Sequence, residues 1–357
     1  MTARTERKPD HHVLDAAEAW ERLLAIRSRA DAEAARLVVG GAKAGPAWQW
    51  RQDATPEADR LADFYGPLCL AGPHVTFAQL GQSLDGFIAT RTGDADYVTG
   101  EDDRRHLHRL RALADAVVVG AGTAVADDPQ LTVRACAGPN PLRIVLDPQG
   151  RVPLKRRVFM DGSAPTLWVV GVGQDRERSA VPDGVDILTL PDRDAFAPAR
   201  LVQTFARRGL GRLLIEGGGV TVSRFLHERA LHRLYVTVAP VLLGDGVPGL
   251  RFPGPVVMRD ALRPPVRRTV LGEDTLYELD LGTPQSGHPA TADEHCSGER
   301  TAVERPAERS ANACCGGRPA RTDSGEPPAE EHPCTGKTGR EGEHSVHHGD
   351  GQPLCRP

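Results

Sequence analysis

The central part of the chain, from residue 73 to about residue 282, alternates between two patterns of apolar and polar residues. Short runs rich in β-branched residues are apolar at successive positions, which predicts strands that are buried on both faces of a parallel sheet. These runs are AVVVGAG, LRIVLD, TLWVVG, VDILTL and RLLIEGG, preceded by HVTFAQLG and followed by LHRLYVTVAPVLLG and RRTVLGEDTLYELDL. Segments with apolar residues at helical spacing separate them, namely GEDDRRHLHRLRALADA, APARLVQTFARRGL and VTVSRFLHERAL. This alternation predicts an α/β fold with helices on the faces of the sheet. We expect Thr99 and Asp102 to form a capping box at the start of the first of these helices.

The two ends of the chain have different patterns. Residues 1–70 are rich in Ala and Arg, and Ala16, Trp20, Leu23 and Leu24 follow helical spacing, which predicts one or two helices that pack on the main domain. Residues 283–357 are rich in Gly, Pro, Glu, Arg and Ser and nearly free of aliphatic residues, so we expect a disordered tail. The chain therefore divides into a helical N-terminal extension (1–70), a main domain (71–282) and a tail (283–357).

Composition narrows the function classes. Charged residues make up 26% and hydrophobic residues 39% of the chain, which suits a packed core, and the net charge of -4 argues against a general nucleic-acid binder. An apolar run of the ~20 residues that a membrane span needs is absent, so we expect a cytoplasmic protein. Of the seven cysteines, only Cys69 and Cys136 lie in the parts expected to fold, which does not indicate a disulfide framework. The Cys and His residues of the tail lack the paired spacing of a zinc site, and no metal is expected.

The segment RLLIEGGGVTVSRFLHERAL, residues 212–231, is the first candidate for chemistry. An apolar run ends in Glu216, three glycines follow, and a helical segment begins. Such a turn lets backbone N–H groups and the helix N-terminus face an anion, since a Cβ would block the close approach of a phosphate. The spacing is not GxGxxG, and a tight turn without a ligand is the alternative interpretation.

A second segment, VVVGAGTAVADDPQLTVR, repeats this order. A buried strand leads into a glycine-rich turn with Thr123, followed by the acids Asp127 and Asp128 and then by Arg134. Arg111, on the preceding helix, could hold a phosphate through its guanidinium group. The alternative is a solvated arginine on a basic helix.

Six motifs occur in one order: SLDGFIAT, GDADYVTG, HRLRALADAVVVGAGTAVADDPQLTVR, PLRIVLDPQGRVP, LLIEGGG and APVLLGDG. Together they resemble the reductase domain of the riboflavin pathway, which forms the C-terminal half of the bifunctional bacterial deaminase–reductase and the free-standing pyrimidine reductases of archaea and fungi. The resemblance implies a dihydrofolate-reductase-like fold with a mostly parallel central sheet and helices on both faces. It also implies a homodimer that uses NADPH to reduce the ribosyl group of a phosphoribosylamino-pyrimidine to the ribityl form.

The resemblance also assigns residues. The positions that match cofactor contacts are Gly81, Tyr97, Thr123, Asp127, Pro148, Gly218, Gly219, Val220, Thr221, Val222, Ser223 and Arg224. The positions that match substrate contacts are Ala95, Arg111, Leu131, Arg134 and Glu216, with the two arginines at the substrate phosphate. Asp127 and Glu216 are the candidate catalytic acids. Three positions depart from the pattern: Ala95 and Pro148 stand where the family often has serine, and Gln79 stands where bacterial bifunctional enzymes usually have lysine.

Several functions stay open at this point. The substrate is either 5-amino-6-(5-phosphoribosylamino)uracil or its 2,5-diamino-pyrimidinone counterpart, and deamination is not expected because residues 1–72 lack the H-x-E and P-C-x-x-C motifs of zinc deaminases. A related reductase of a specialised flavin-like pathway and a non-catalytic NADPH-binding module are the alternatives. Each of these functions requires the two glycine-rich turns to meet over one cleft.

Overall fold

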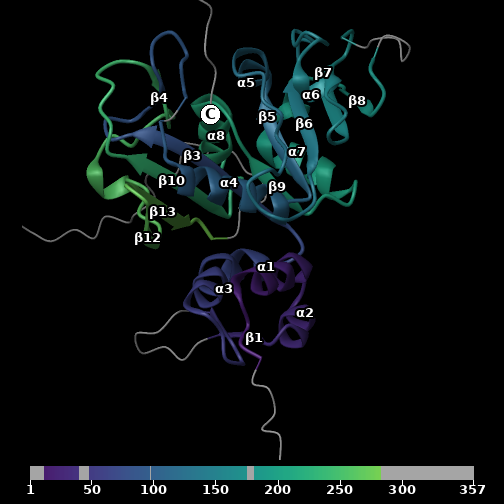
Figure 1. Cartoon of the computed structure of the whole chain (residues 1–357). Helices are drawn as coiled ribbons and strands as arrows, with labels where there is room; N and C mark the ends of the chain where they lie inside the picture. The colour runs from purple at the N-terminus through teal and green to yellow at the C-terminus, as the bar shows by residue number, and fades with distance from the viewer. Residues whose placement is uncertain (1–11, 40–47, 97, 175–180, 283–357) are drawn as a thin grey trace, which may run out of the picture. The chain divides into compact units, whose positions relative to one another are not determined.

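The computed structural model describes residues 12–39, 48–96, 98–174 and 181–282, all of which belong to one compact unit, Met1–Asp293 (Figure 1). The predicted tail, residues 283–357, and the candidate residue Tyr97 lie outside the described residues. No helix within the described ranges combines the length and the apolar character needed to cross a membrane.

The main sheet of the described chain has nine strands, and seven neighbouring strands run parallel. In spatial order they are β12 (Val266–Leu271), β13 (Asp274–Asp280), β10 (Arg233–Ala239), β3 (Val75–Ser83), β9 (Arg212–Ile215), β5 (Ala116–Gly120), β6 (Leu142–Asp147), β7 (Thr166–Gly171) and β8 (Val185–Leu190). Only β13 and β12, at one edge, pair antiparallel with their neighbours. A short pair, β4 (Phe87–Ala89) and β11 (Val247–Pro248), lies outside this sheet.

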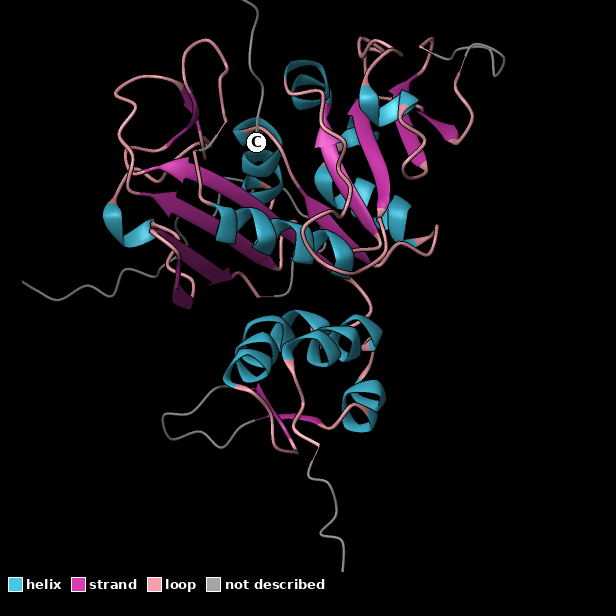
Figure 2. Cartoon of the chain, viewed as in Figure 1, coloured by secondary structure: helices cyan, strands magenta, loops and turns pink. Residues whose placement is uncertain are grey.

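Helices cover both faces of the sheet (Figure 2). On the first face lie α4 (Glu101–Leu113), α5 (Ala121–Ala126) and α6 (Arg157–Met160), and on the second lie α7 (Pro198–Ala206) and α8 (Gly219–His227). Alternate residues of β5 show why the strand is apolar throughout: Val117 and Val119 pack in the first core, and Ala116 and Val118 pack in the second. The predicted fold class, a mostly parallel sheet with helices on both faces, is confirmed.

The N-terminal segment is more elaborate than the one or two helices expected. It contains α1 (Ala16–Ala25), α2 (Arg29–Ala34), β1 (Leu37–Val39), β2 (Trp48–Trp50) and α3 (Pro56–Cys69). The helix α3 begins at a Thr55 cap and continues through Gly66 and Pro67, two residues that interrupt a helical pattern in sequence. Tertiary packing overrides that local preference, because Gly66 lies against the ring of Trp48, where a Cβ would come within 2.8 Å.

This N-terminal segment shares the core of the first face. Trp20 donates from Nε1 to the Ala137 carbonyl (2.6 Å), and the buried Arg212 at the start of β9 donates to the carbonyls of Ile26 (2.9 Å) and Cys69 (2.7 Å). The hydroxyl of Tyr65 also hydrogen-bonds Nδ1 of His106 on α4 (2.9 Å), next to the apolar core of the first face. The segment therefore supports α4, which carries the candidate substrate residue Arg111.

The start of α4 corrects one prediction. Its N-cap is Gly100, and no side chain caps it, so the predicted box between Thr99 and Asp102 is wrong. The Gly100 N–H instead donates to the carboxylate of Asp274 (2.7 Å), the first residue of β13. A tertiary contact thus replaces the local cap, and Thr99 bonds to Asp103.

We predict that Trp20→Ala lowers the free energy of unfolding by about 3–5 kcal/mol, the usual cost of truncating a buried aromatic residue. Trp20 is 5% exposed and also packs edge-on against Tyr65, so its loss leaves a cavity where the N-terminal segment meets the sheet. Urea unfolding followed by circular dichroism measures the change. The matched control is Glu21→Ala on the same helix, an exposed position that should change stability by at most about 0.5 kcal/mol. Equal effects of the two substitutions would contradict the shared core.

Candidate functional site

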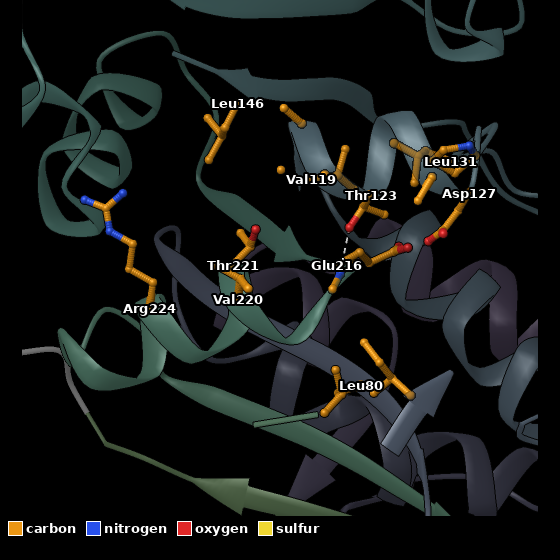
Figure 3. Close-up of a pocket in the computed structure, with 18 of the residues that line it drawn as sticks. Leu80, Val119, Thr123, Asp127, Leu131, Leu146, Glu216, Val220, Thr221 and Arg224 are labelled. Atoms are coloured by element: carbon orange, nitrogen blue, oxygen red, sulfur yellow. Dashed lines mark hydrogen bonds between the residues drawn. The ribbon is translucent and has the colours of Figure 1, made fainter. Parts of the chain in front are cut away.

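A cleft of about 1550 Å³ opens at the carboxyl ends of the parallel strands (Figure 3). Its lining comes from the ends of β3, β5, β6, β7 and β9 and from the turns that follow them. The strand order places β9 between β3 and β5, while the helix after β3 covers the first face and the helix after β9 covers the second. Open α/β sheets bind ligands at such a topological switch point. The volume exceeds the usual ~300–1,000 Å³ of one small-molecule site, which suits two ligands side by side.

The two glycine-rich turns meet in this cleft, as the sequence predicted. The N–H of Gly218 donates to Oγ1 of Thr123 (2.7 Å), drawn as a dashed line in Figure 3. The contact requires glycine at position 217, where φ is +96° and a Cβ would lie 2.6 Å from Thr123 Oγ1. On the other side of the same corner, a Cβ on Gly120 would lie 2.5 Å from Oγ1 of Thr221.

The N-terminus of α8 faces the cleft. Its N-cap is Gly218, and no side chain caps the helix, so its first backbone N–H groups and its dipole are suited to an anion. Of the candidate cofactor residues in this segment, Gly218, Val220, Thr221 and Arg224 line the cleft.

The remaining three candidates of that segment serve the packing of α8. Gly219 lies against the loop after β11, so that a Cβ there would come within 1.8 Å of the Gly249 carbonyl. Val222 is buried in the second core, and Ser223 accepts the Arg251 N–H through its hydroxyl (2.7 Å). These three residues are therefore not part of the cleft lining.

The other cofactor candidates with described coordinates also line the cleft: Gly81, Thr123, Asp127 and Pro148. A Cβ on Gly81 would lie 2.8 Å from the methyl group of Thr99, so glycine keeps this wall of the cleft close to the β3 backbone. The carbonyl of Pro148 accepts the Gly171 N–H (3.2 Å). Asp127 lies at the rim, where partial desolvation raises the pKa of its carboxyl group.

Arg111 and Glu216 form a buried bidentate ion pair at the floor of the cleft. Nε and Nη2 of Arg111 donate to the two carboxylate oxygens of Glu216, each at 2.8 Å, and Nη1 donates to the Thr132 carbonyl (3.0 Å). Arg111 is 7% and Glu216 5% exposed, and both line the cleft. Because each terminal guanidinium nitrogen carries two N–H groups, Arg111 retains donors for a ligand.

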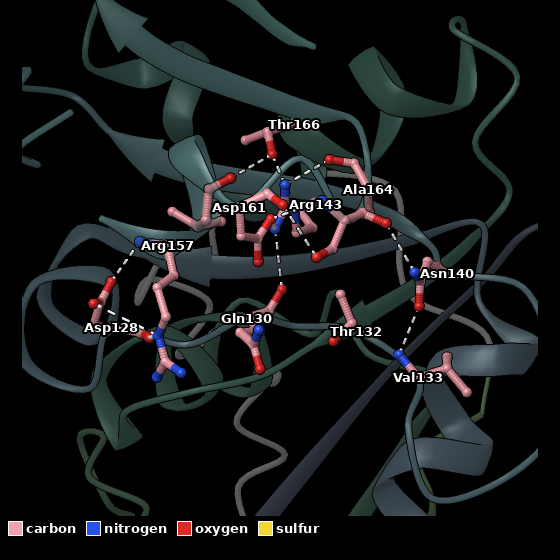
Figure 4. Close-up of polar contacts among 12 residues, drawn as sticks. Asp128, Gln130, Thr132, Val133, Asn140, Arg143, Arg157, Asp161, Ala164 and Thr166 are labelled. Atoms are coloured by element: carbon pink, nitrogen blue, oxygen red, sulfur yellow. Dashed lines mark hydrogen bonds and ion pairs between the residues drawn. The ribbon is translucent and has the colours of Figure 1, made fainter. Parts of the chain in front are cut away.

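The loop between α5 and β6 carries two more substrate candidates and is held rigidly (Figure 4). Asp128 (φ 42°) and Leu131 (φ 56°) adopt the left-handed conformation, which is uncommon outside glycine. The N–H of Arg157 donates to the Asp128 carboxylate (2.7 Å), and Arg143 donates to the Gln130 carbonyl (3.3 Å). These contacts fix the buried Leu131 in the cleft wall.

Of the last two substrate candidates, Ala95 lines the cleft and Arg134 does not. Arg134 is exposed, and its Nη1 donates to the hydroxyl of Thr132 (2.7 Å), the residue whose carbonyl binds Arg111. The two arginines therefore meet at Thr132, with Arg134 outside the wall that Arg111 forms.

Sequence reasoning missed Asp103. This residue is 3% exposed, lines the cleft, and accepts hydrogen bonds from Nε2 of Gln79 (3.1 and 3.2 Å) and from the hydroxyl of Thr237 (2.5 Å). Burial raises the pKa of its carboxyl group. In sequence it belongs to the acidic run Glu101–Asp103, which is typical of an exposed first turn of a helix. Only the rotation of α4 against the sheet distinguishes it from its exposed neighbours.

Comparison with known proteins agrees with this architecture. The family model described as the RibD C-terminal domain matches residues 73–263, more than half of the chain. A riboflavin biosynthesis protein RibD of Aquifex aeolicus is 33% identical over 186 residues, which cover 52% of this chain and 51% of that protein. The 2,5-diamino-6-ribosylamino-4(3H)-pyrimidinone 5′-phosphate reductase of Methanothermobacter thermautotrophicus is 36% identical over 211 residues, which cover 56% of this chain and 94% of that enzyme. The chain thus spans about half the length of the RibD relative and nearly all of the reductase.

Solved structures share the fold. Acinetobacter baumannii RibD superposes with a TM-score of 0.51 at 25% identity and covers 64% of each chain. The diaminohydroxyphosphoribosylaminopyrimidine deaminase/5-amino-6-(5-phosphoribosylamino)uracil reductase of Thermotoga maritima gives 0.50 at 24% identity, again over 64% of each chain. The predicted resemblance to the riboflavin-pathway reductase domain is confirmed.

We predict that Glu216→Gln destabilises the protein by about 3–5 kcal/mol, because it leaves the buried guanidinium of Arg111 without a counter-charge. The control is Glu101→Gln, which removes one partner of the exposed pair between Arg105 and Glu101 (3.0 Å) on the same helix as Arg111. An exposed pair is worth at most about 1 kcal/mol. Chemical unfolding of both variants measures the two losses of stability. Similar losses would show that the Arg111–Glu216 pair contributes no more to stability than an exposed pair.

Proposed function

Because the chain belongs to the RibD C-terminal domain family, we propose that it reduces the ribosyl group of a phosphoribosylamino-pyrimidine to the ribityl form, with NADPH as reductant, in riboflavin biosynthesis. The observation that carries the proposal is the hydrogen bond between Gly218 and Thr123, which joins an uncapped helix N-terminus to the turn after β5 within one cleft. That cleft has room for a dinucleotide and a phosphorylated sugar together.

The cofactor side of the proposal rests on α8 and the turns around it. The backbone at Gly218 and the uncapped first turn of α8 would hold the NADPH diphosphate, with Thr123 fixing the position of that turn. Thr221 and Arg224 line the same wall and would contact the rest of the dinucleotide. When bound, NADPH supplies the hydride, and the protein aligns the reacting carbon and excludes water.

The substrate side rests on the Arg111–Glu216 pair. We assign Glu216 to binding because both of its oxygens already accept hydrogen bonds from Arg111, which orients the carboxylate toward a ribose hydroxyl or the pyrimidine. The remaining N–H groups of Arg111, together with Arg134, would hold the phosphate, and Leu131 and Ala95 would shape the wall around the sugar. Asp127, at the rim with a raised pKa, is the acid that sequence reasoning places nearest to the cofactor.

The homodimer implied by the resemblance and the cytoplasmic location expected from the sequence composition stay predictions. Two other functions also stay open. A reductase of a specialised flavin-like pathway would share this cleft and differ at positions such as Gln79 and Ala95. A non-catalytic NADPH-binding module would bind the cofactor and turn over neither pyrimidine.

Assays with the purified full-length protein distinguish the proposed function from these two alternatives. Quenching of intrinsic fluorescence reports NADPH binding, and the absorbance of NADPH reports turnover with the 5-amino-uracil form and with the 2,5-diamino form. The proposed function requires oxidation of NADPH by one of the two compounds. Binding of NADPH without its oxidation would identify the non-catalytic module. A protein that turns over neither compound but reduces a different ribosylamino-heterocycle would be the specialised reductase.

We predict that Arg134→Ala raises the apparent binding constant of the pyrimidine phosphate by about 10- to 100-fold, as expected for the loss of a charge-assisted hydrogen bond to an anion. The affinity for NADPH should stay within about twofold, because Arg134 lies next to Thr132, on the substrate side. Arg105→Ala, an exposed arginine on α4, is the control for a general change in charge. Equal losses of both affinities would show that Arg134 does not act at the substrate phosphate.

A further inference from the structure

We propose that Asp103, rather than Asp127 or Glu216, delivers the proton that accompanies hydride transfer, an inference that rests on the proposed function. The position of Asp103 supports this role. It lies in the first turn of α4, on the wall of the cleft that Gln79, Gly81 and Thr99 also line. It is thus a buried acid with access to the space where the substrate sugar would bind.

The hydrogen bonds around Asp103 hold its carboxyl group in place and leave Oδ2 as the oxygen with the longer contact. Oδ1 accepts from the hydroxyl of Thr237 (2.5 Å) and from Nε2 of Gln79 (3.1 Å), so this oxygen is fixed as an acceptor. Oδ2 has a longer contact with Gln79 (3.2 Å) and lies beside Gly81, where a Cβ would be 3.5 Å away. Thr99, which lies closer still to Gly81, also hydrogen-bonds the carboxyl group, and its hydroxyl can accept a proton as well as donate one.

The charges nearby favour the protonated form. None of the ion pairs among the described residues involves Asp103, and its partner on β3 is the neutral amide of Gln79. Desolvation is the largest cause of the raised pKa of Asp103, and the carboxylate of Asp274, which accepts the Gly100 N–H, is a like charge that raises this pKa further. The hydrogen bonds from Thr237, Thr99 and Gln79 lower the pKa and offset part of the rise. A lysine at position 79 would instead place a positive charge on the carboxyl group and keep it ionised. Gln79 therefore changes which residue can supply the proton.

Two titratable side chains near Asp103, those of His106 and Tyr65, keep one charge state across the neutral range. Burial lowers the pKa of His106 to about 3, so its ring is neutral, and burial also raises the pKa of Tyr65, so its hydroxyl stays protonated. Arg111, further along α4, is paired with Glu216. A change in activity with pH that Asp103→Asn abolishes would therefore not come from His106 or Tyr65.

The step balances. Hydride from NADPH forms a C–H bond at C1 of the sugar. In the closed sugar, the bond between C1 and the ring oxygen breaks and its electron pair goes to that oxygen. In the open imine, the second bond between C1 and nitrogen breaks and its electron pair goes to that nitrogen. The Asp103 carboxyl transfers its proton to the same atom and becomes a carboxylate, which water reprotonates. One NADPH and one proton are consumed for each ribityl product, and the sugar is reduced by two electrons.

The test compares Asp103→Asn with Asp127→Asn in the full-length protein. Asparagine keeps the shape of the side chain and cannot donate an acidic proton. We expect Asp103→Asn to lower kcat at least about 100-fold, the usual contribution of a general acid, with NADPH affinity within about twofold of the native value. In the native protein kcat should fall as pH rises through the pKa of the acid, and this decline should disappear in Asp103→Asn. Asp127→Asn should weaken NADPH binding and keep the decline.

A second measurement does not depend on turnover. The carboxyl carbon of Asp103, labelled with carbon-13 and assigned by comparison with Asp103→Asn, should titrate above the ordinary aspartate pKa of about 3.9 in the free protein. If Asp103→Asn fails to fold, assignment by Asp103→Glu serves the same purpose.

Three results would overturn the inference. The first is an Asp103 carboxyl group that titrates at or below the ordinary aspartate pKa. The second is an Asp103→Asn variant that keeps at least a third of the native kcat. The third is a decline of kcat with rising pH that Asp127→Asn abolishes and Asp103→Asn keeps. Failure of the native protein to oxidise NADPH with either pyrimidine is a separate result, which overturns the proposed function and this inference together.

Discussion

The buried ion pair between Arg111 and Glu216 is the constraint on which the cleft depends. It joins α4, which covers one face of the sheet, to the end of β9, the strand that is followed by the helix on the opposite face. Neither charge could be buried alone at acceptable cost, so the pair requires both elements to be in place. It also explains why an apolar strand ends in a carboxylate: Glu216 is the first residue after β9, and it meets a guanidinium that a helix far away in sequence provides.

Much of the fold could be predicted because its strands are buried on both faces and therefore appear in the sequence as short, continuous apolar runs. Runs such as Ala116–Gly120 are apolar throughout, and the glycine-rich turns that follow them identified the two corners of the cleft. The N-terminal segment was harder to predict. Its helix α3 contains Gly66 and Pro67 and is held by contacts with a tryptophan of β2 and with the sheet, contacts that no local pattern encodes. The same limitation explains the wrong prediction of a cap at Thr99, since the carboxylate that binds the Gly100 N–H at the start of α4 comes from Asp274 on β13.

The candidate site shows the same division between local and tertiary information. Motif spacing identified Thr123, Arg111 and Glu216, which the fold brings to one cleft. It could not separate the residues of the α8 segment that face the cleft from Val222 and Ser223, which pack inward. Nor could it find Asp103, because adjacent acids in one helical turn look alike in sequence although only one of them turns toward the sheet. The rotation of α4 about its axis is set by the packing of all the residues between the helix and the sheet. A comparison with a family, position by position, does not give this rotation.

The three consecutive glycines after Glu216 illustrate how a simple repeat can encode three unrelated requirements. Position 217 needs a left-handed backbone, position 218 must fit beside a threonine hydroxyl, and position 219 must let the carbonyl of Gly249 approach within a distance that excludes any side chain. The last contact seats the loop after β11 on the first turn of α8, and β11 is paired with β4, which leads toward Ala95, a proposed substrate contact. A methyl group at position 219 would therefore displace the loop after β11 and the β4–β11 pair, so that a change at the proposed dinucleotide site would alter the proposed sugar site although the residues of that second site stay the same.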